Sequence, residues 1–220
     1  MQAPRIKKQE TASAEVVSCI LILAVLAAGI GIFAAVALPE LDTSAEVKHK
    51  TELQNSFLSF KTALDKLWIL GGPGTYGSML LPAESAAVHL MPGASLSFQH
   101  TEGNATAELL CLSVLPGYYF IENQEYLLEG GAVFFDERLI LPAASGAEDA
   151  VLLCFAGAEQ TILANVPVTV SYRYEEAATY TNVSTLRISG TPYQEYWEET
   201  LRGTENLTLL FFSAELEAAA

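Results

Sequence analysis

An unbroken apolar run near the N-terminus limits the possible folds of this chain more than any other feature. From Val16 to Leu38 every residue is apolar or small except Ser18 and Cys19. About 23 residues at about 1.5 Å of helical rise each cover roughly 34 Å, enough to cross the hydrocarbon core of a bilayer. The run therefore predicts one membrane-spanning helix.

The charges on the two sides of this run differ in sign. Arg5, Lys7 and Lys8 precede it, and from Val16 onward 24 of the 26 acidic residues face only eight of the 11 basic ones. By the positive-inside rule we expect a cytoplasmic N-terminus and a body outside the membrane. The net charge of −15 repels phosphate groups, so nucleic acid is not expected as a partner.

The apolar run is either a signal peptide that is cleaved off or a helix that stays attached to the protein. A secretory signal peptide has a shorter apolar core that ends in an A-x-A-like site, which residues 35–37 would supply. Against cleavage there, the run is too long and its leader contains Glu10 and Glu15. A lipoprotein signal fails because Cys19 lies at the start of the run rather than at its end.

Small residues within the run share one face of the predicted helix. They follow one another in steps of four, three and four positions, at Ala24, Ala28, Gly31 and Ala35. Such a face allows close helix packing inside a membrane, although alanine and glycine are also common in membrane helices of every kind. The pattern is consistent with helix-on-helix assembly.

A second, amphipathic helix follows the apolar run. Pro39 is expected to kink or interrupt the first helix, and residues 42–44 can cap a new one. Its apolar stripe is Leu53, Phe57, Phe60, Leu64 and Leu67, with Lys61 and Asp65 off the stripe. The sequence GGPG at 71–74 predicts the end of the helix.

From about Tyr76 the chain changes to short strand-like runs separated by turn residues. A short helix is expected within 191–203, where Tyr196 and Trp197 would be packing aromatics. The expected strands are Ser95–Gln99, Ala107–Leu115, Tyr118–Glu122, Ala132–Phe135, Ala150–Ala156, Val166–Tyr174, Ser184–Ile188 and Leu207–Phe212.

These patterns predict an α+β protein. A long N-terminal helix, transmembrane in its first half and amphipathic in its second, would pack on an antiparallel β-sandwich-like head. The expected organisation is a leader over 1–12, a transmembrane or assembly helix over 13–38, an amphipathic helix over 39–70 and a β-rich extracellular domain over 71–220.

Candidate modification sites lie within the predicted head. Asn104, Asn182 and Asn206 each begin an N-x-S/T sequon, which a glycosylating enzyme can use only in an exported protein. Cys111 and Cys154 fall in apolar strand candidates. They are expected either to form a disulfide between facing strands or to be buried free thiols.

The sequence contains no motif typical of an enzyme or of a cofactor site. His49, His89 and His100 are far apart and lack ligand-pair spacing. A nucleophile elbow, a phosphate-binding loop, a dinucleotide-binding loop and a calcium loop are all missing from the sequence. We therefore expect neither catalysis nor a bound cofactor or metal.

Four segments resemble archaeal type IV pilins and a group of euryarchaeal pilin-like envelope proteins. TASAEVVS, at 11–18, is similar to the archaeal prepilin processing segment. EVKHKTELQNSFLSFKTALDKL, at 46–67, is similar to the amphipathic segment that follows the membrane helix in that group. LLEGGAV, at 127–133, and YQEYWEETL, at 193–201, look like features of the same group.

The resemblance implies processing by a membrane-embedded prepilin peptidase on the cytoplasmic side. A cut after Ala12 would leave Ser13 as the new N-terminus and Glu15 as the third residue. A cut after Glu10 would place Glu15 fifth, but glutamate fits poorly before the cut. The retained helix would then anchor the protein in the membrane or form the core of a filament, with Glu15 partly neutralising the new amine.

Three functions remain open from the sequence. The favoured one is a pilin-like surface subunit whose head serves adhesion or envelope contacts, with the membrane, the prepilin peptidase and copies of itself as partners. The second is a membrane-anchored envelope protein that does not polymerise and whose head binds another envelope protein. The third is a secreted enzyme or binding module behind a long signal peptide.

Overall fold

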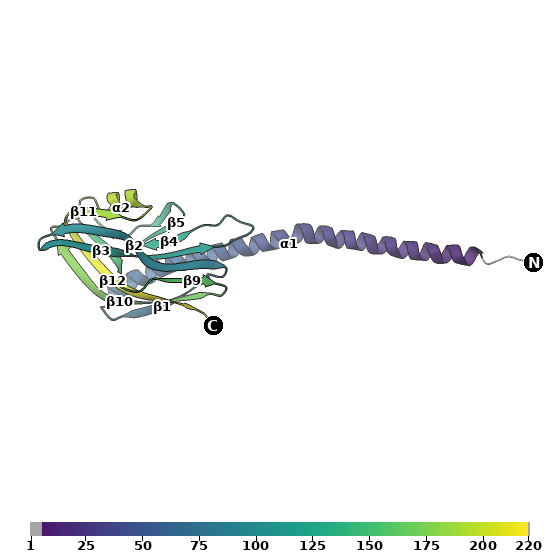
Figure 1. The fold of residues 1–220 in the computed structure, drawn as a ribbon, viewed down its shortest axis with the longest axis horizontal. Helices are drawn as coiled ribbons and strands as arrows, with labels where there is room; N and C mark the ends of the chain where they lie inside the picture. Colours follow the sequence, from purple (N-terminus) through teal and green to yellow (C-terminus); the bar gives the residue numbers. More distant parts are fainter. Residues whose placement is uncertain (1–5, 220) are drawn as a thin grey trace, which may run out of the picture. The chain divides into compact units, whose positions relative to one another are not determined.

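The structure is a computed structural model that describes residues 6–219; the side chains of 6–15, 34–39 and 41 lie outside its described part. The chain forms two compact units, Met1–Val47 and Lys48–Ala220, and the second is called the β unit (Figure 1). The elements are α1 (Ile6–Leu70), β1 (Tyr76–Leu81), β2 (Ala86–His100), β3 (Gly103–Pro116), β4 (Tyr126–Glu129), β5 (Ala132–Phe135), β6 (Arg138–Leu141), β7 (Ala144–Ser145), β8 (Asp149–Phe155), β9 (Gln160–Ala164), β10 (Val168–Thr181), β11 (Ser184–Ser189), α2 (Gln194–Thr200) and β12 (Asn206–Ala218).

The expected long N-terminal helix is a single element, and the interruption that Pro39 could have caused does not occur. Helix α1 is assigned without a break from Ile6 to Leu70, so Pro39 does not interrupt it and residues 42–44 do not cap a new start. A proline removes one intrahelical hydrogen bond and crowds the preceding turn. Extending an existing helix adds one hydrogen bond per residue, whereas nucleating a new one is unfavourable, so the long turns on both sides outweigh this loss.

The predicted end of the helix at the GGPG sequence is confirmed. Helix α1 ends at Leu70, and the Gly71 amide donates to the Leu67 carbonyl oxygen at 2.9 Å. A Cβ atom on Gly71 would lie 2.5 Å from that same oxygen and 2.7 Å from Thr75 Oγ1. Only glycine therefore fits at this position.

The strands form one large, curled, mixed sheet of 12 strands in an α+β fold. The order along it is β1-β10-β12-β8-β3-β4-β5-β6, while β2 pairs with β3, β9 and β11, and β7 pairs with β8. Strands β12 and β8 run parallel, whereas the other pairings are antiparallel. An antiparallel head was expected, but the sheet contains this one parallel pair. Parallel neighbours need a long crossover, and the chain between β8 and β12 supplies one.

The expected strands agree with the structure in part. Strand β5 has the predicted bounds, and β11 and β8 lie within one residue of theirs. The expected strand Tyr118–Glu122 is not formed, because the Asn123 side chain accepts a hydrogen bond from the Tyr118 amide and closes a loop. Five strands were not expected from the sequence: β1, β4, β6, β7 and β9.

The central strands of the sheet are buried on both faces. Leu110, Leu112 and Val114 of β3 belong to one core cluster, whereas Leu109 and Cys111, which point to the opposite face, belong to a second. This two-sided burial explains why β3 reads as an apolar run rather than as an alternating pattern.

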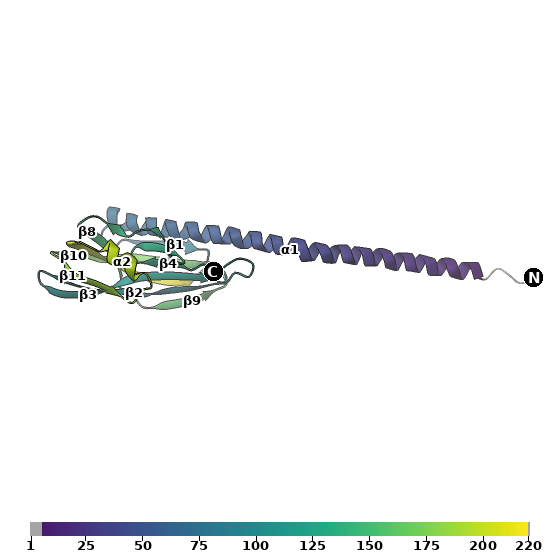
Figure 2. The same ribbon diagram turned by 90° about the horizontal axis from the view of Figure 1, so that it is seen from above.

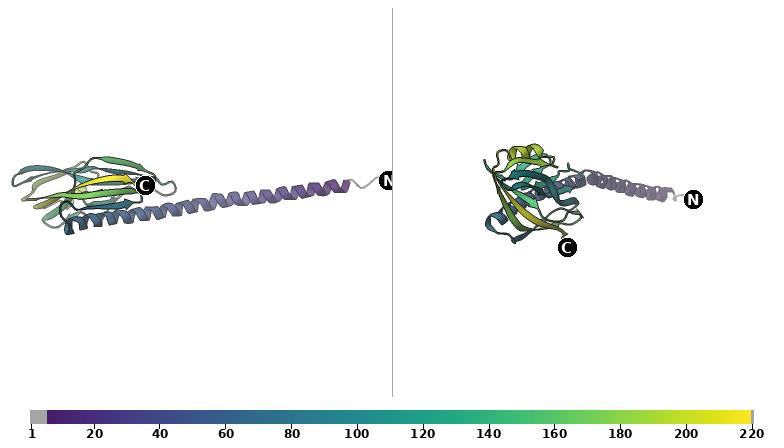
Figure 3. Two further views of the ribbon diagram at one scale, coloured as in Figure 1. Left: turned by 90° about the horizontal axis from the view of Figure 1, so that it is seen from below. Right: turned by 60° about the vertical axis from the view of Figure 1, so that its left-hand side comes forward.

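The two clusters differ in the helix that contributes to them. The stripe residues Leu53, Phe57, Phe60 and Leu64 lie in the first cluster, in the part of α1 that belongs to the β unit (Figure 2). The Phe60 ring lies edge-on to Tyr172, with 5.2 Å between ring centroids. Helix α2, which lies at the upper edge of the strands in the right view of Figure 3, contributes Trp197 to the second cluster.

Lys61 lies off the apolar stripe, as expected, but it is buried. It is only 5% exposed, and its ammonium group pairs with the Asp65 carboxylate one turn later. A lysine is rarely buried this deeply without an anionic partner. The stripe therefore has a charged pair at its margin.

Replacing Leu64 by aspartate should destabilise the β unit. Leu64 is fully buried in the first cluster, so the change removes apolar contacts and buries a charge, which together cost about 4 kcal/mol or more. Thermal unfolding followed by circular dichroism measures the loss. The matched control is Lys66→Asp, two residues away at an exposed position. A Leu64→Asp variant with the wild-type melting temperature would contradict the packing of this stripe.

Candidate functional site

The apolar stretch Val16–Phe33 of α1 is the first candidate site. It is the one stretch in the described part of the chain that is long and apolar enough to cross a membrane, and none of it is buried. Val25 and Ile30, for example, are 69% and 68% exposed. A membrane anchor and a signal sequence both have this character. The stretch can leave water only by entering a lipid phase or by packing on other proteins.

The predicted processing residues belong to the same helix. Ala12, Ser13 and Glu15 lie within the bounds of α1, but their side chains are outside the described part of the structure. The side chains of the alternative cleavage site, at residues 35–37, also lie outside the described part of the structure. Both sites therefore stay predictions from sequence.

The three sequons, spread over about a hundred residues of sequence, meet at one end of the β unit. This end, called the Asn104 end, consists of the turns at 100–104 and 181–184 and of the segment 203–206 before β12. The Asn182 Nδ2 atom donates to Thr101 Oγ1 at 3.3 Å, and the Val183 amide donates to the Glu205 carbonyl oxygen at 2.9 Å. Pairing registers create this gathering, so the sequence alone could not reveal it.

The three asparagines differ in how accessible they are to a modifying enzyme. Asn104 and Asn182 are exposed, and Asn182 lies in a turn with a backbone φ of 53°. Asn206 is half-buried, and its Nδ2 atom donates to Asp149 Oδ1 at 2.9 Å. A glycan on Asn206 would have to break this bond, so Asn104 and Asn182 are the better acceptors.

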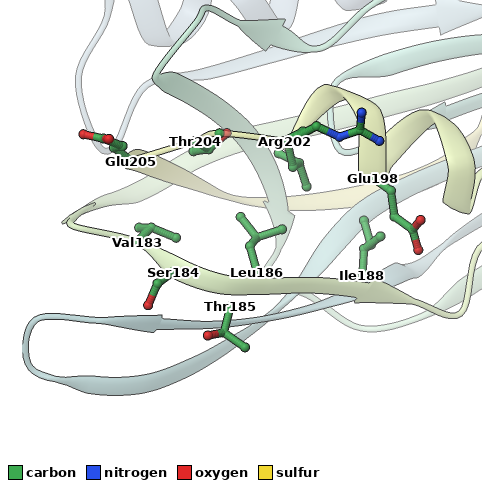
Figure 4. A pocket seen from close by; sticks show the side chains of 11 residues that line it. Val183, Ser184, Thr185, Leu186, Ile188, Glu198, Arg202, Thr204 and Glu205 are labelled. Carbon is green, nitrogen blue, oxygen red and sulfur yellow. The ribbon is translucent and has the colours of Figure 1, made fainter.

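A hollow of about 550 Å³ opens at the same end (Figure 4). Its apolar floor comes from Val183, Leu186 and Ile188, which point toward the loop that follows α2. Hydroxyl and charged groups surround this floor: Ser184, Thr185, Glu198, Arg202, Thr204 and Glu205. The hollow can form contacts with a polar partner. No motif in the sequence indicated it.

The histidines lie in separate surroundings. His49 Nδ1 is 2.8 Å from the Tyr118 hydroxyl and its Nε2 is 3.1 Å from Glu84 Oε2. His89 contacts Thr161, and the His100 ring packs against Tyr180. Among the described residues, no group of three histidine, cysteine or carboxylate side chains could hold a metal ion.

A buried carboxylate joins the segments at 127–133 and 193–201, the two segments of the β unit that look like features of the pilin-like group. Glu129 is 2% exposed and accepts three hydrogen bonds: from the Trp197 indole at 2.9 Å, the Thr191 hydroxyl at 2.7 Å and the Ala94 amide at 3.0 Å. Gly130 follows with φ +57°, and a Cβ atom there would lie 2.9 Å from the Trp197 ring. The Glu-Gly sequence is therefore required by packing against α2.

Replacing Glu129 by glutamine should lower the free energy of unfolding by about 2–3 kcal/mol, because one of its two oxygens becomes an NH₂ group that faces buried donors. Denaturant unfolding of the detergent-solubilised chain measures the change. Glu217→Gln makes the same substitution at an exposed position and should leave stability unchanged. Equal stability of the two variants would contradict the hydrogen bonds at Glu129.

Cys111 and Cys154 are both free thiols, and the structure has no disulfide between them. Both lie in the second core cluster, where Cys154 is paired across the sheet with Leu109, two residues from Cys111. Burial raises the pKa of each thiol to about 12, and for Cys111 the carboxylates of Glu129 and Glu125 raise it further. They have the character of small buried hydrophobic residues.

Alkylation can count these thiols. At pH 8 a thiol with a pKa of about 12 is in the reactive thiolate form roughly once in 10,000 molecules. In a Cys19→Ser variant, we expect the native protein to take up no N-ethylmaleimide, and the unfolded protein to take up two equivalents without reductant, measured as a mass shift. Uptake that requires a reductant would reveal a disulfide and contradict the free thiols.

Comparison of the chain with protein-family models, with curated proteins and with solved structures gives no match. The function proposed for this protein therefore rests on its own residues and on their geometry.

Proposed function

We propose that this protein is a pilin-like surface protein, held in the membrane by its N-terminal helix and exposing the β unit outside the cell. The observation that carries the proposal is the apolar stretch Val16–Phe33, which is wholly exposed in the structure. At about 25 cal/mol per Å² of apolar surface, such a stretch is strongly unfavourable in water. A bilayer, or a filament core made of neighbouring copies, would cover it.

The distribution of charge supports the proposed orientation. Basic residues precede the stretch, and the rest of the chain is strongly acidic, which favours a cytoplasmic N-terminus and an external β unit. In that orientation a prepilin peptidase would meet the leader on the cytoplasmic side and cut after Ala12. Glu15 would then lie two residues from the new amine of Ser13 and partly neutralise its charge.

The Asn104 end is the proposed contact surface. Its two exposed sequons, at Asn104 and Asn182, are available for glycosylation in an exported protein. The hollow beside them combines an apolar floor with Glu198, Arg202 and hydroxyl groups. An adhesive or envelope contact would use such a mixed surface, and the protein would need no catalytic group or cofactor for it.

Lipid alone could cover the apolar stretch, so a second function remains. In this alternative the protein stays in the membrane as a single anchored copy and its β unit binds another envelope protein. The small-residue positions Ala24, Ala28 and Gly31 favour assembly, and a Cβ atom added at Gly31 would meet nothing within 4 Å in the single chain. A filament neighbour would therefore have free access to this face.

The third alternative, a secreted enzyme or binding module behind a cleaved signal peptide, requires loss of the whole stretch.

N-terminal sequencing of the protein from an archaeal host with a prepilin peptidase tests the proposal. We expect a mature chain that begins at Ser13. Ala12→Gln should block the cut because the peptidase requires a small residue there, whereas the matched change Ala14→Gln, beyond the cut, should allow it. A chain that begins at Leu38 would overturn both the pilin-like and the anchored proposals.

Shearing the same cells separates the two membrane-held functions. Recovery of the chain in sheared filaments supports the pilin-like subunit. Complete retention in the membrane fraction supports the unpolymerised anchor and counts against assembly.

A further inference from the structure

The outer face of strands β1, β10 and β12 contains an open hollow of about 540 Å³, called the Tyr76 hollow. These three strands are neighbours in the sheet (Figure 1). Met79, Tyr172 and Ala214 pack in or against the first core cluster. Because side chains alternate between the two faces of a strand, the residues on either side of these three point away from that core. The hollow lies among these outward side chains.

Two rows of side chains cross the three strands within the hollow. The pairing register places Tyr76, Arg173 and Ser213 in the first row, and Ser78, Ser171 and Glu215 in the second. Neighbouring strands are about 4.8 Å apart, and every second residue along a strand is about 6.8 Å from the last. The two rows therefore cover an area of roughly 10 Å by 7 Å, which suits a small polar molecule.

Tyr76 adds one apolar plane to this polar surface. Its side chain is 82% exposed. The buried Tyr172 ring lies so close to Gly77 that a Cβ atom there would be 2.7 Å from the Tyr172 hydroxyl oxygen, so β1 is packed against the core beside Tyr76. A tyrosine ring provides a large contact area and has few rotatable bonds to immobilise. The ring can therefore bind a flat apolar face of a ligand at a small entropic cost.

The charged groups of the hollow are held by one another. Arg173 Nε is 3.6 Å from Glu175 Oε2, and the Ser213 hydroxyl donates to Glu175 Oε1. A guanidinium has more donors than one carboxylate uses, and a carboxylate has more acceptor sites than these two contacts occupy. Both groups can therefore form further hydrogen bonds in directions that are already set, which lowers the cost of binding a polar ligand.

We propose that the Tyr76 hollow binds an uncharged sugar. One face of a sugar ring consists of C–H groups, which would lie on the Tyr76 ring. Its neighbouring hydroxyl groups would form hydrogen bonds with Arg173, Glu175 and Glu215. These two carboxylates outnumber the one guanidinium, in a chain with a net charge of −15, so an anionic ligand would be repelled.

This site is separate from the Asn104 end and adds a ligand to the surface function proposed above. Ser213 is seven residues along β12 from Asn206, about 24 Å away. Every residue that forms the site belongs to the β unit. The proposal is therefore independent of the membrane anchor.

Saturation-transfer NMR on the full-length chain tests the site, in a phosphocholine detergent, which has no sugar head group. The probes are the methyl glycosides of glucose, galactose and mannose. We expect transfer of saturation from the protein to the ring protons of at least one probe. Tyr76→Ala should reduce this transfer about tenfold because the stacking face is lost, whereas Tyr76→Phe should keep it.

The next row on the same strands supplies matched controls. Leu80 and Glu217 flank Thr169 in that row, outside the lining of the hollow. Leu80→Ala and Glu217→Ala should leave the transfer unchanged, whereas Glu215→Ala should reduce it about tenfold, because hydrogen bonds to a charged group are lost.

Three results would overturn the sugar site and leave the anchor intact. The first is the absence of transfer to all three probes. The second is transfer that Tyr76→Ala leaves at the wild-type level, because the sugar would then bind elsewhere. The third is transfer confined to methyl glucuronide, an anionic probe measured alongside the others.

Discussion

The buried Glu129 carboxylate is the interaction on which the second core depends. Its oxygens accept hydrogen bonds from β2, from the loop before α2 and from Trp197 of α2 itself. A carboxylate this deeply buried is strongly unfavourable unless its donors are in place. These hydrogen bonds fix Trp197 at the end of β4, where Gly130 leaves room for its ring.

The two cores follow from the curl of the sheet. Strands β4 and β5 are buried throughout. Each of their positions therefore needs an apolar residue or, as at Glu129, a polar group whose hydrogen bonds are satisfied. The stripe of α1 supplies the apolar partner on one face, and α2 with β2 and β11 supplies it on the other. Residues at the margin of this arrangement bring their own partners, as Lys61 does with Asp65.

Local patterns in the sequence predicted the features that depend on local chemistry. The heptad stripe, the helix end at Gly71 and the short aromatic helix at α2 each have their cause within a few residues of chain. Strand β4 was missed because the charged Glu129 interrupts its short apolar run, whereas β5, which has the same length, is wholly apolar and was predicted. Tyr118–Glu122 has strand-like residues, but the Asn123 side chain closes it into a loop. Neither the gathering of the sequons nor the hollow beside them could be predicted, because strand register brings together turns about 80 residues apart, as the contact from Asn182 to Thr101 shows.

The polar character of the Asn104 end follows from the length of the strands that lead to it. Long strands such as β2, β3 and β10 extend from one end to the other, so each end displays only turns and loops, whose side chains the core does not constrain. At the Asn104 end these turns are polar and contain the exposed sequons, as a surface in contact with water requires. The apolar stretch Val16–Phe33 is not covered by the core either, because none of it is buried. The proposed anchor would place this stretch in lipid, while the polar turns of the Asn104 end stay in water.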